Sequence, residues 1–100
     1  MKVTIQSIHF DAKDALKQYV QDKCNKLDRY YDGILSGSVS LKLQQEVKQA
    51  NKLVEIRLQV PGDILMASQE GQTFEEATDL VTDKLKEQIK RYKERQHGHA

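Results

Sequence analysis

The spacing of apolar side chains changes several times along this chain, and these changes limit the fold more than any other feature. An apolar residue at every second position indicates a strand with one buried face, whereas three- and four-residue steps indicate an amphipathic helix. Alternation predicts strands over residues 2–8, 38–47, 52–60 and 64–69. Helical spacing predicts helices over residues 12–31 and from Thr73 onwards. The predicted order of elements is therefore β-α-β-β-β-α.

Capping residues mark the ends of both predicted helices. Asp11 is expected to cap the first helix with Asp14 as its partner, and Gly33 to end it, because glycine tolerates the left-handed conformation that follows many helices. Thr73 and Glu76 have the spacing of a capping box at the start of the second helix. The apolar stripes are Leu16, Tyr19, Val20, Cys24, Leu27, Tyr30 and Tyr31 in the first helix, and Phe74, Ala77, Val81, Leu85, Ile89 and Tyr92 in the second.

The connections between the elements predict the topology. A helix separates the first two strands, so these can be parallel and joined by a right-handed crossover. The polar link 48–51 and the turn at Pro61-Gly62-Asp63 are short, which predicts an antiparallel meander that Gly71 ends. One apolar face per element predicts an α+β domain, a two-layer sandwich with both helices on one face of a four-stranded sheet. We expect a single domain over residues 1–95 and a disordered tail over residues 96–100.

Length and composition exclude several classes of protein. The chain has 100 residues, of which 38% are hydrophobic, which suits one modest core. No apolar run approaches the ~18–20 residues that cross a bilayer, and the N-terminus lacks the apolar stretch of a signal peptide. Cys24 is the single cysteine and has no disulfide partner in the chain. We therefore expect a cytoplasmic protein without a membrane partner.

The net charge of +1 hides three blocks of charge. Residues 1–62 carry ten basic and seven acidic side chains, and residues 63–83 carry six acidic and no basic ones. Residues 84–100 carry six basic side chains against Glu87 and Glu94. The near-neutral total is thus no argument against a polyanionic partner, because one part of the chain is strongly basic.

The sequence offers little for catalysis or for binding a cofactor. His9 follows the first strand, where a solvent-facing role suffices, and Cys24 lies on an apolar stripe as a small buried thiol. His97 and His99 stand on the predicted tail, whereas structural metal sites usually have four ligands. The five glycines are scattered and form no phosphate-binding loop. We predict no enzyme, no metal, no cofactor and no small-molecule substrate.

Basic residues of the second helix form two rows when they are placed at ~100° per residue. Lys84, Arg91 and Arg95 fall on one flank of the apolar stripe, and Lys86, Lys90 and Lys93 form a row further round. Favourable interaction with the helix macrodipole explains basic residues near the C-terminus, but it does not explain their arrangement around the axis.

The first helix carries a lysine where an apolar residue is expected. Lys23 lies inside the apolar stripe and Lys26 borders it. A snorkelling side chain, with a buried stem and a hydrated amine, is one explanation. The other is a nucleic-acid-binding face in which Lys23 and Lys26 join the flank of Lys84 and Arg91. Tyr30, Tyr31 and Tyr92 can supply stacking surfaces there, although their helical spacing is also that of core residues.

The order, spacing and length of these segments resemble the family of ribosome hibernation-promoting factors and ribosome-associated inhibitors, also called sigma-54 modulation proteins. The residues that carry the resemblance are Ala15-Leu16, Tyr19-Val20, Lys23, Lys26-Leu27, Tyr30-Tyr31, Ala67-Ser68, Glu70-Gly71, Asp83-Lys84-Leu85, Gln88 and Lys93. The family's β-α-β-β-β-α fold is similar to double-stranded-RNA-binding domains. It agrees with the order predicted above.

The resemblance implies a partner and a site. Family members bind the small ribosomal subunit and its rRNA in the decoding channel, where they block messenger and transfer RNA and inhibit translation in idle cells. Lys23, Lys26, Lys84 and Lys93 match the family pattern as RNA-binding residues, and Lys86, Lys90, Arg91 and Arg95 fit it by charge and location. Thr73-Phe74-Glu75 and Glu87 depart from the pattern. The length is that of the short form, which implies a monomer off the ribosome.

Two other functions remain open at this point. One is a general module that binds structured RNA, which would bind a free RNA duplex as tightly as it binds a ribosome. The other is a protein-interaction module that modulates a transcription factor, as the name sigma-54 modulation suggests. Binding that is insensitive to salt would favour the protein-interaction module, because phosphate contacts weaken steeply with salt.

Overall fold

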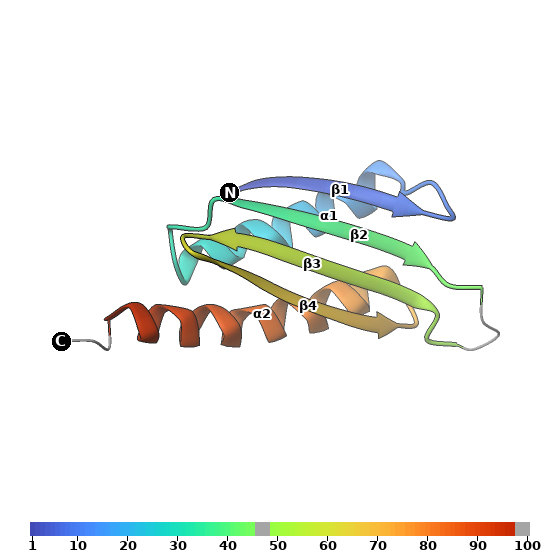
Figure 1. Cartoon of the computed structure of the whole chain (residues 1–100). Helices are drawn as coiled ribbons and strands as arrows, with labels where there is room; N and C mark the ends of the chain where they lie inside the picture. Colours follow the sequence, from blue (N-terminus) through green and yellow to red (C-terminus); the bar gives the residue numbers. More distant parts are fainter. Residues whose placement is uncertain (46–48, 98–100) are drawn as a thin grey trace.

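The computed structural model describes residues 1–45 and 49–97, and it confirms the predicted order of elements (Figure 1). The elements are β1 (Lys2–Ile8), α1 (Asp14–Asn25), a 3₁₀ helix η1 (Lys26–Arg29), β2 (Ser36–Leu43), β3 (Lys52–Val60), β4 (Asp63–Gly71) and α2 (Phe74–His97). Both helices begin at the same end of the sheet. The reason is that β4 runs in the same direction as β1, and that α1 follows β1 while α2 follows β4.

The four strands form one sheet in the order β1-β2-β3-β4. β1 pairs with β2 in parallel, and the other two pairings are antiparallel, as the connection lengths predict. The register aligns Ile5 with Val39, Val39 with Ile56, and Ile56 with Ala67. This row of apolar residues crosses all four strands on one face. Strand periodicity therefore places a continuous apolar surface where the helices pack.

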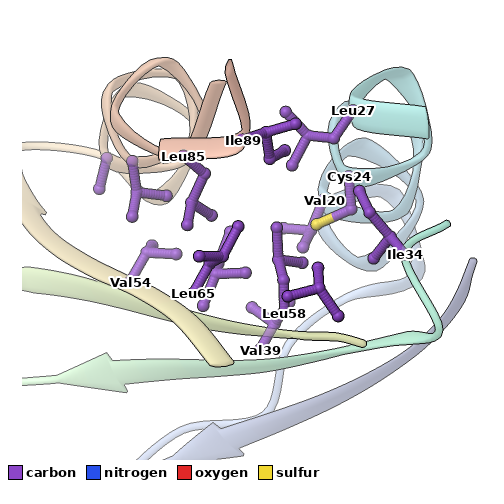
Figure 2. Close-up of a cluster of buried hydrophobic side chains, with 14 of the residues drawn as sticks. Val20, Cys24, Leu27, Ile34, Val39, Val54, Leu58, Leu65, Leu85 and Ile89 are labelled. Atoms are coloured by element: carbon purple, nitrogen blue, oxygen red, sulfur yellow. The ribbon is translucent and has the colours of Figure 1, made fainter. Parts of the chain in front are cut away.

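The core lies between this face of the sheet and the two helices (Figure 2). Fully buried side chains come from α1, α2 and the central strands, and include Val20, Cys24, Val39, Val54, Leu58, Leu85 and Ile89. The whole predicted stripe of α2 is buried, from Phe74 to Tyr92. The opposite face of the sheet is open, and Ile64 and Met66 on β4 are 47% and 52% exposed there. The helices thus cover one side only, as predicted.

Helix α1 differs from its prediction at both ends. Its N-cap is Lys13 in an extended conformation without a side-chain hydrogen bond, so the expected capping role of Asp11 is wrong. The α-helix ends at Asn25 and tightens into η1, which ends at Arg29. The apolar stripe continues across this junction, because three-residue steps suit 3₁₀ and α geometry equally. The periodicity alone therefore could not separate the two helices.

Two glycines mark where the chain turns or passes closely, at Gly62 and Gly71. Gly62 has a φ of 77° in the predicted turn after β3. The left-handed conformation expected at Gly33 is absent, because Gly62 is the one described glycine with positive φ. Gly71 ends β4, as predicted, and it is buried there, where a Cβ atom would lie 2.9 Å from the backbone nitrogen of Ala77. That glycine permits the close approach of β4 to α2.

Helix α2 begins with the predicted cap and extends further than predicted. The backbone N–H of Glu76 donates to Thr73 Oγ1 at 3.0 Å, and Glu76 Oε2 accepts from the backbone N–H of Gln72 at 3.2 Å. The helix continues to His97, so Gln96 and His97 are helical where a disordered tail was expected. Residues 98–100 of the expected tail lie outside the described residues, as do residues 46 and 47 at the predicted end of β2, which ends at Leu43.

Candidate nucleic-acid interface

One basic row of α2 lies along the edge strand β4. The Lys84 ammonium donates to the carbonyl oxygen of Ser68 at 3.2 Å, and the Gln88 amide donates to that of Met66 at 2.9 Å. Arg95 lies 3.6 Å from Asp63 at the start of the same strand. Lys84, Arg91 and Arg95 share this flank, and we call them the β4-side row. Its lysine satisfies a carbonyl of an edge strand, which makes that edge less able to pair with another chain.

The other basic row of α2 faces α1 and η1. The Lys86 ammonium lies 5.1 Å from the ring centroid of Tyr30, and the Lys93 ammonium donates to the Tyr30 carbonyl oxygen at 3.4 Å. Lys90 lines a cleft there together with Arg29 of η1. Lys26, at the start of η1, is exposed and makes no ion pair with a described residue. We call Lys26, Arg29, Lys86, Lys90 and Lys93 the inter-helix surface.

This arrangement corrects one sequence-based expectation. Lys23 and Lys26 were expected to join Lys84 and Arg91, but both lie close to Asp79, on the flank of α2 that carries Lys86, Lys90 and Lys93. The contacts of α2 with Tyr30 on one flank and with β4 on the other establish which row meets α1. The angular separation of the rows was correct, but the identity of the neighbouring element on each side is a property of helix packing. Arg29 was missed, although it stands three residues after Lys26.

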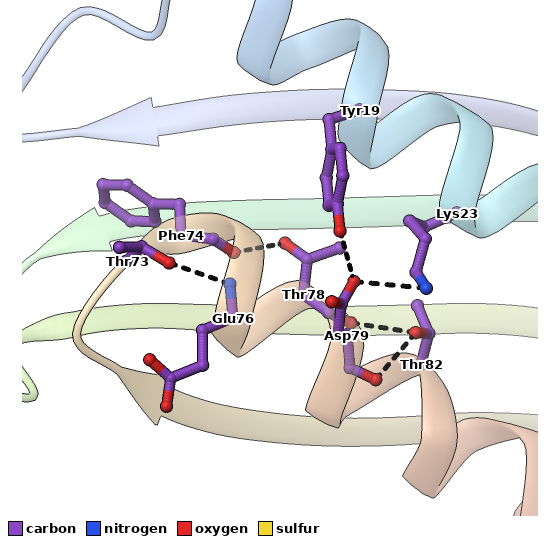
Figure 3. A network of polar contacts seen from close by, with 8 residues as sticks. All are labelled: Tyr19, Lys23, Thr73, Phe74, Glu76, Thr78, Asp79 and Thr82. Atoms are coloured by element: carbon purple, nitrogen blue, oxygen red, sulfur yellow. Dashed lines mark hydrogen bonds and ion pairs between the residues drawn. The ribbon is translucent and has the colours of Figure 1, made fainter.

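Lys23 is engaged in a polar network between the two helices (Figure 3). Its ammonium lies 3.1 Å from Asp79 Oδ1, and the Tyr19 hydroxyl donates to the same oxygen at 2.6 Å. The Lys23 side chain is 28% exposed. The polar end of the lysine that stands in an apolar stripe is therefore paired with a carboxylate, which fixes α1 against α2. Lys23 is less available to an external phosphate than Lys26.

The network shifts the pKa values of both acidic members. Desolvation raises the pKa of the Asp79 carboxyl, but hydrogen bonds from Tyr19 and Lys23 and the charges of Lys23 and Lys26 outweigh it and leave the pKa below its usual value. The hydrogen bond to Asp79, followed by desolvation and by the charges of Asp79 and Glu75, raises the pKa of Tyr19 to about 12. Around neutral pH the pair is therefore a carboxylate that accepts from a neutral phenol.

Replacing Asp79 with asparagine is expected to reduce stability by about 1 kcal/mol at neutral pH, because one ion pair and the charge on the acceptor are lost. A carboxyl with a lowered folded-state pKa stabilises above its unfolded pKa and ceases to do so as pH falls through the lowered value. The difference from wild type should thus vanish in acid. Urea unfolding across the acid range measures it, and a difference that persists below the folded-state pKa would contradict the role of the charge.

Of the remaining candidate residues, Tyr92 and Cys24 are buried. Tyr92 is 2% exposed, and its hydroxyl donates to the Pro61 carbonyl oxygen at 2.6 Å, so it belongs to the core. Burial, and secondarily the charge of Asp28, raises the pKa of the Cys24 thiol to about 12, which keeps it a thiol. His9 is exposed with a φ of 69°. His99 and the side chain of His97 lie outside the described residues.

The described parts of the chain contain no group of three or more His, Cys, Asp or Glu residues placed to hold a metal ion. Within the same parts, neither helix combines the length and the apolar character that crossing a membrane requires. Two basic rows lie on opposite flanks of α2, and Glu87 and Glu94 are exposed on the crest between them.

Comparison with known proteins gives consistent results. Residues 3–97 match the model of the family described as Sigma 54 modulation protein / S30EA ribosomal protein. A ribosome hibernation promoting factor from Azotobacter vinelandii is 34% identical over 96 residues, which is 96% of this chain and 86% of the relative. The N-terminal domain of Protein Y from Thermus thermophilus superposes with a TM-score of 0.79 at 30% identity, covering 92% of this chain and 99% of that one. A ribosomal subunit interface protein from Coxiella burnetii has the same fold, with a TM-score of 0.81 at 22% identity over 93% of this chain and 98% of its own.

Proposed function

The chain belongs to the Sigma 54 modulation protein / S30EA ribosomal protein family, and we propose that it is a hibernation factor that binds the small ribosomal subunit in the decoding channel. It blocks messenger and transfer RNA there and inhibits translation in idle cells. The observation that carries the proposal is the inter-helix surface, where Lys26, Arg29, Lys86, Lys90 and Lys93 come together from η1 and α2. Occupancy is steric and electrostatic rather than catalytic.

The inter-helix surface suits RNA backbone better than a protein partner. Each lysine or arginine that neutralises a phosphate releases counterions, and five such residues give a strong dependence on salt. Folded RNA is recognised mainly through its shape and backbone, which does not require a base-specific pocket for every contact. The β4-side row of Lys84, Arg91 and Arg95 adds contacts at the periphery, with Arg91 the member that makes no internal bond to a described residue. Lys23 contributes chiefly by positioning α1.

Co-sedimentation tests the proposal directly. The protein should pellet with purified small subunits at low salt and be released as the salt rises from about 50 to about 200 mM, with an affinity loss of about 10²–10³-fold. A protein that stays in the supernatant at low salt contradicts the proposal. Equal binding to an RNA duplex of matched charge would favour a general RNA-binding module instead. Off the ribosome we propose a cytoplasmic monomer, which light scattering after gel filtration checks.

Asp79→Asn has an expected effect on binding that is opposite to its effect on stability. The substitution removes a negative charge beside the inter-helix surface and releases the Lys23 ammonium from its partner at 3.1 Å. Affinity for the small subunit should rise by a few fold, while the folded state becomes less stable, because phosphate binding responds to local charge. Filter binding at fixed salt measures it. A fall in affinity would show that Asp79 acts on binding through helix placement rather than through charge.

A further inference from the structure

A cleft lies between η1 and the C-terminal half of α2. It has a volume of about 410 Å³ and is lined by Arg29, Tyr30, Lys90, Lys93 and Glu94. Clefts that bind small ligands usually measure about 300–1,000 Å³, so this one is large enough for a nucleotide. It lies within the inter-helix surface, and it differs from the rest of that surface because an aromatic ring and a carboxylate accompany its cations.

The aromatic wall of the cleft is held in place from two sides. Lys93 binds the main-chain oxygen of Tyr30 at 3.4 Å, and Lys86 lies 5.1 Å from the centroid of its ring. Tyr30 is half-buried, so it is not enclosed by the core. By contrast, the rings of Tyr31 and Tyr92 pack against each other with centroids 5.5 Å apart. Of the neighbouring pair Tyr30 and Tyr31, Tyr30 is therefore the one that offers its ring to a ligand.

The charges around the ring suit a ligand that carries a negatively charged group next to a flat ring. Arg29 and Lys90 are exposed, and Arg29 makes no ion pair with a described residue. Among the described residues, the carboxylate partner of Lys90 is Glu87, at the long distance of 3.9 Å. Glu94 also lines the cleft, from α2, and its carboxylate accepts hydrogen bonds and repels phosphate. A phosphate group is therefore favoured away from Glu94, toward Arg29 of η1.

We propose that this cleft binds one unpaired nucleotide, with its base stacked on Tyr30 and its phosphate held by Arg29 and Lys90. The inference rests on the proposed function when the nucleotide belongs to ribosomal RNA, but the same chemistry fits a free nucleoside polyphosphate. Stacking on an aromatic ring accepts any base and requires that the base be unpaired. An exposed cation–π contact is weaker than stacking of a base, so Lys86 can yield its place over the ring.

The test compares a short single-stranded RNA with an abasic strand of the same length and charge. Fluorescence anisotropy should show tighter binding of the base-bearing strand to wild type, by about tenfold. Tyr30→Leu, which keeps apolar volume, should lose this preference and leave the affinity for the abasic strand unchanged. Tyr31→Leu is the matched control and should keep the preference. Equal affinity of wild type for the two strands, or a preference that survives Tyr30→Leu, would overturn the proposal.

Further measurements separate the sources and guard against a folding defect. Tyr30→Phe retains the ring and should retain the preference even if Tyr30→Leu unfolds; a loss in this folded variant would overturn stacking. Competition by ATP at concentrations where inorganic phosphate does not compete would identify a free nucleotide as a ligand, and competition by neither would identify the RNA strand. Wild type that pellets with small subunits yet ignores the base overturns the cleft alone. Wild type that discriminates the strands but does not pellet overturns the proposed function alone.

Discussion

Reversing three charges of the inter-helix surface, with Lys26→Glu, Lys86→Glu and Lys90→Glu together, is expected to reduce affinity for the small subunit by more than about 100-fold. Three phosphate contacts are lost and three repulsive charges are introduced at the same place. The plot of affinity against salt concentration on logarithmic axes has a negative slope, and this slope should become shallower by about three. Co-sedimentation at a series of salt concentrations measures both quantities. Thermal unfolding should change little, because all three side chains are exposed or half-buried.

A matched triple variant provides the control. Lys2→Glu, Lys13→Glu and Lys17→Glu change the net charge by the same amount, at exposed positions on β1, before α1 and on its first turn. If net charge alone governed binding, the two variants would bind equally weakly. The proposed surface predicts that the control loses only a small part of its affinity. Arg91→Glu, measured separately, reports on the β4-side row.

The second large effect is expected from the core. Leu85→Ala on α2 should destabilise the protein by about 3 kcal/mol and lower its melting temperature by about 12–24 °C. Leu85 is fully buried between α2 and the sheet, so truncation removes buried apolar contacts and leaves a cavity (Figure 2). Calorimetry or urea unfolding at neutral pH measures the loss.

Leu80→Ala is the control for this prediction, because it is the same truncation on the same helix. Leu80 is 41% exposed, and its replacement should cost less than about 1 kcal/mol. Alanine also has the higher helix propensity, which offsets part of that cost. Similar losses at the two positions would contradict the assigned packing of α2. Small-subunit binding by Leu80→Ala should match wild type, since this residue belongs to neither basic row.

Local pattern was sufficient for most of the secondary structure. Alternation gave the bounds of β1 and β3 as the structure has them, and the spacing of Thr73 and Glu76 located the start of α2. The spacing of apolar residues did not predict the ends of α1 correctly. It could not separate α1 from η1, because both place apolar residues at similar steps. It also mistook Asp11 for a cap, because several polar residues precede the helix and the backbone selects only one of them.

For the candidate site, too, the sequence predicts one part of the arrangement and not the other. The sequence shows that Lys86, Lys90 and Lys93 form a different row from Lys84, Arg91 and Arg95, because the angle between residues on one helix is fixed by helical geometry. It cannot show which row faces α1. It also could not show that Lys23 is paired with Asp79, 56 positions further along the chain, or that Tyr30 lines a cleft with Lys90 and Lys93. These contacts join residues that are distant in sequence.

The sequence by itself therefore determined the order of elements, the apolar face of each, and the concentration of positive charge in the last helix. Each of these depends on periodicities within a single segment. Only the tertiary structure decided which cations act together, because α1 packs against one flank of α2 and β4 against the other. That packing assembles the inter-helix surface and binds Lys84 and Arg95 to the edge strand. The positive charge is encoded locally, but its division into a surface that faces α1 and η1 and a row that lies along β4 required the neighbours that folding supplies.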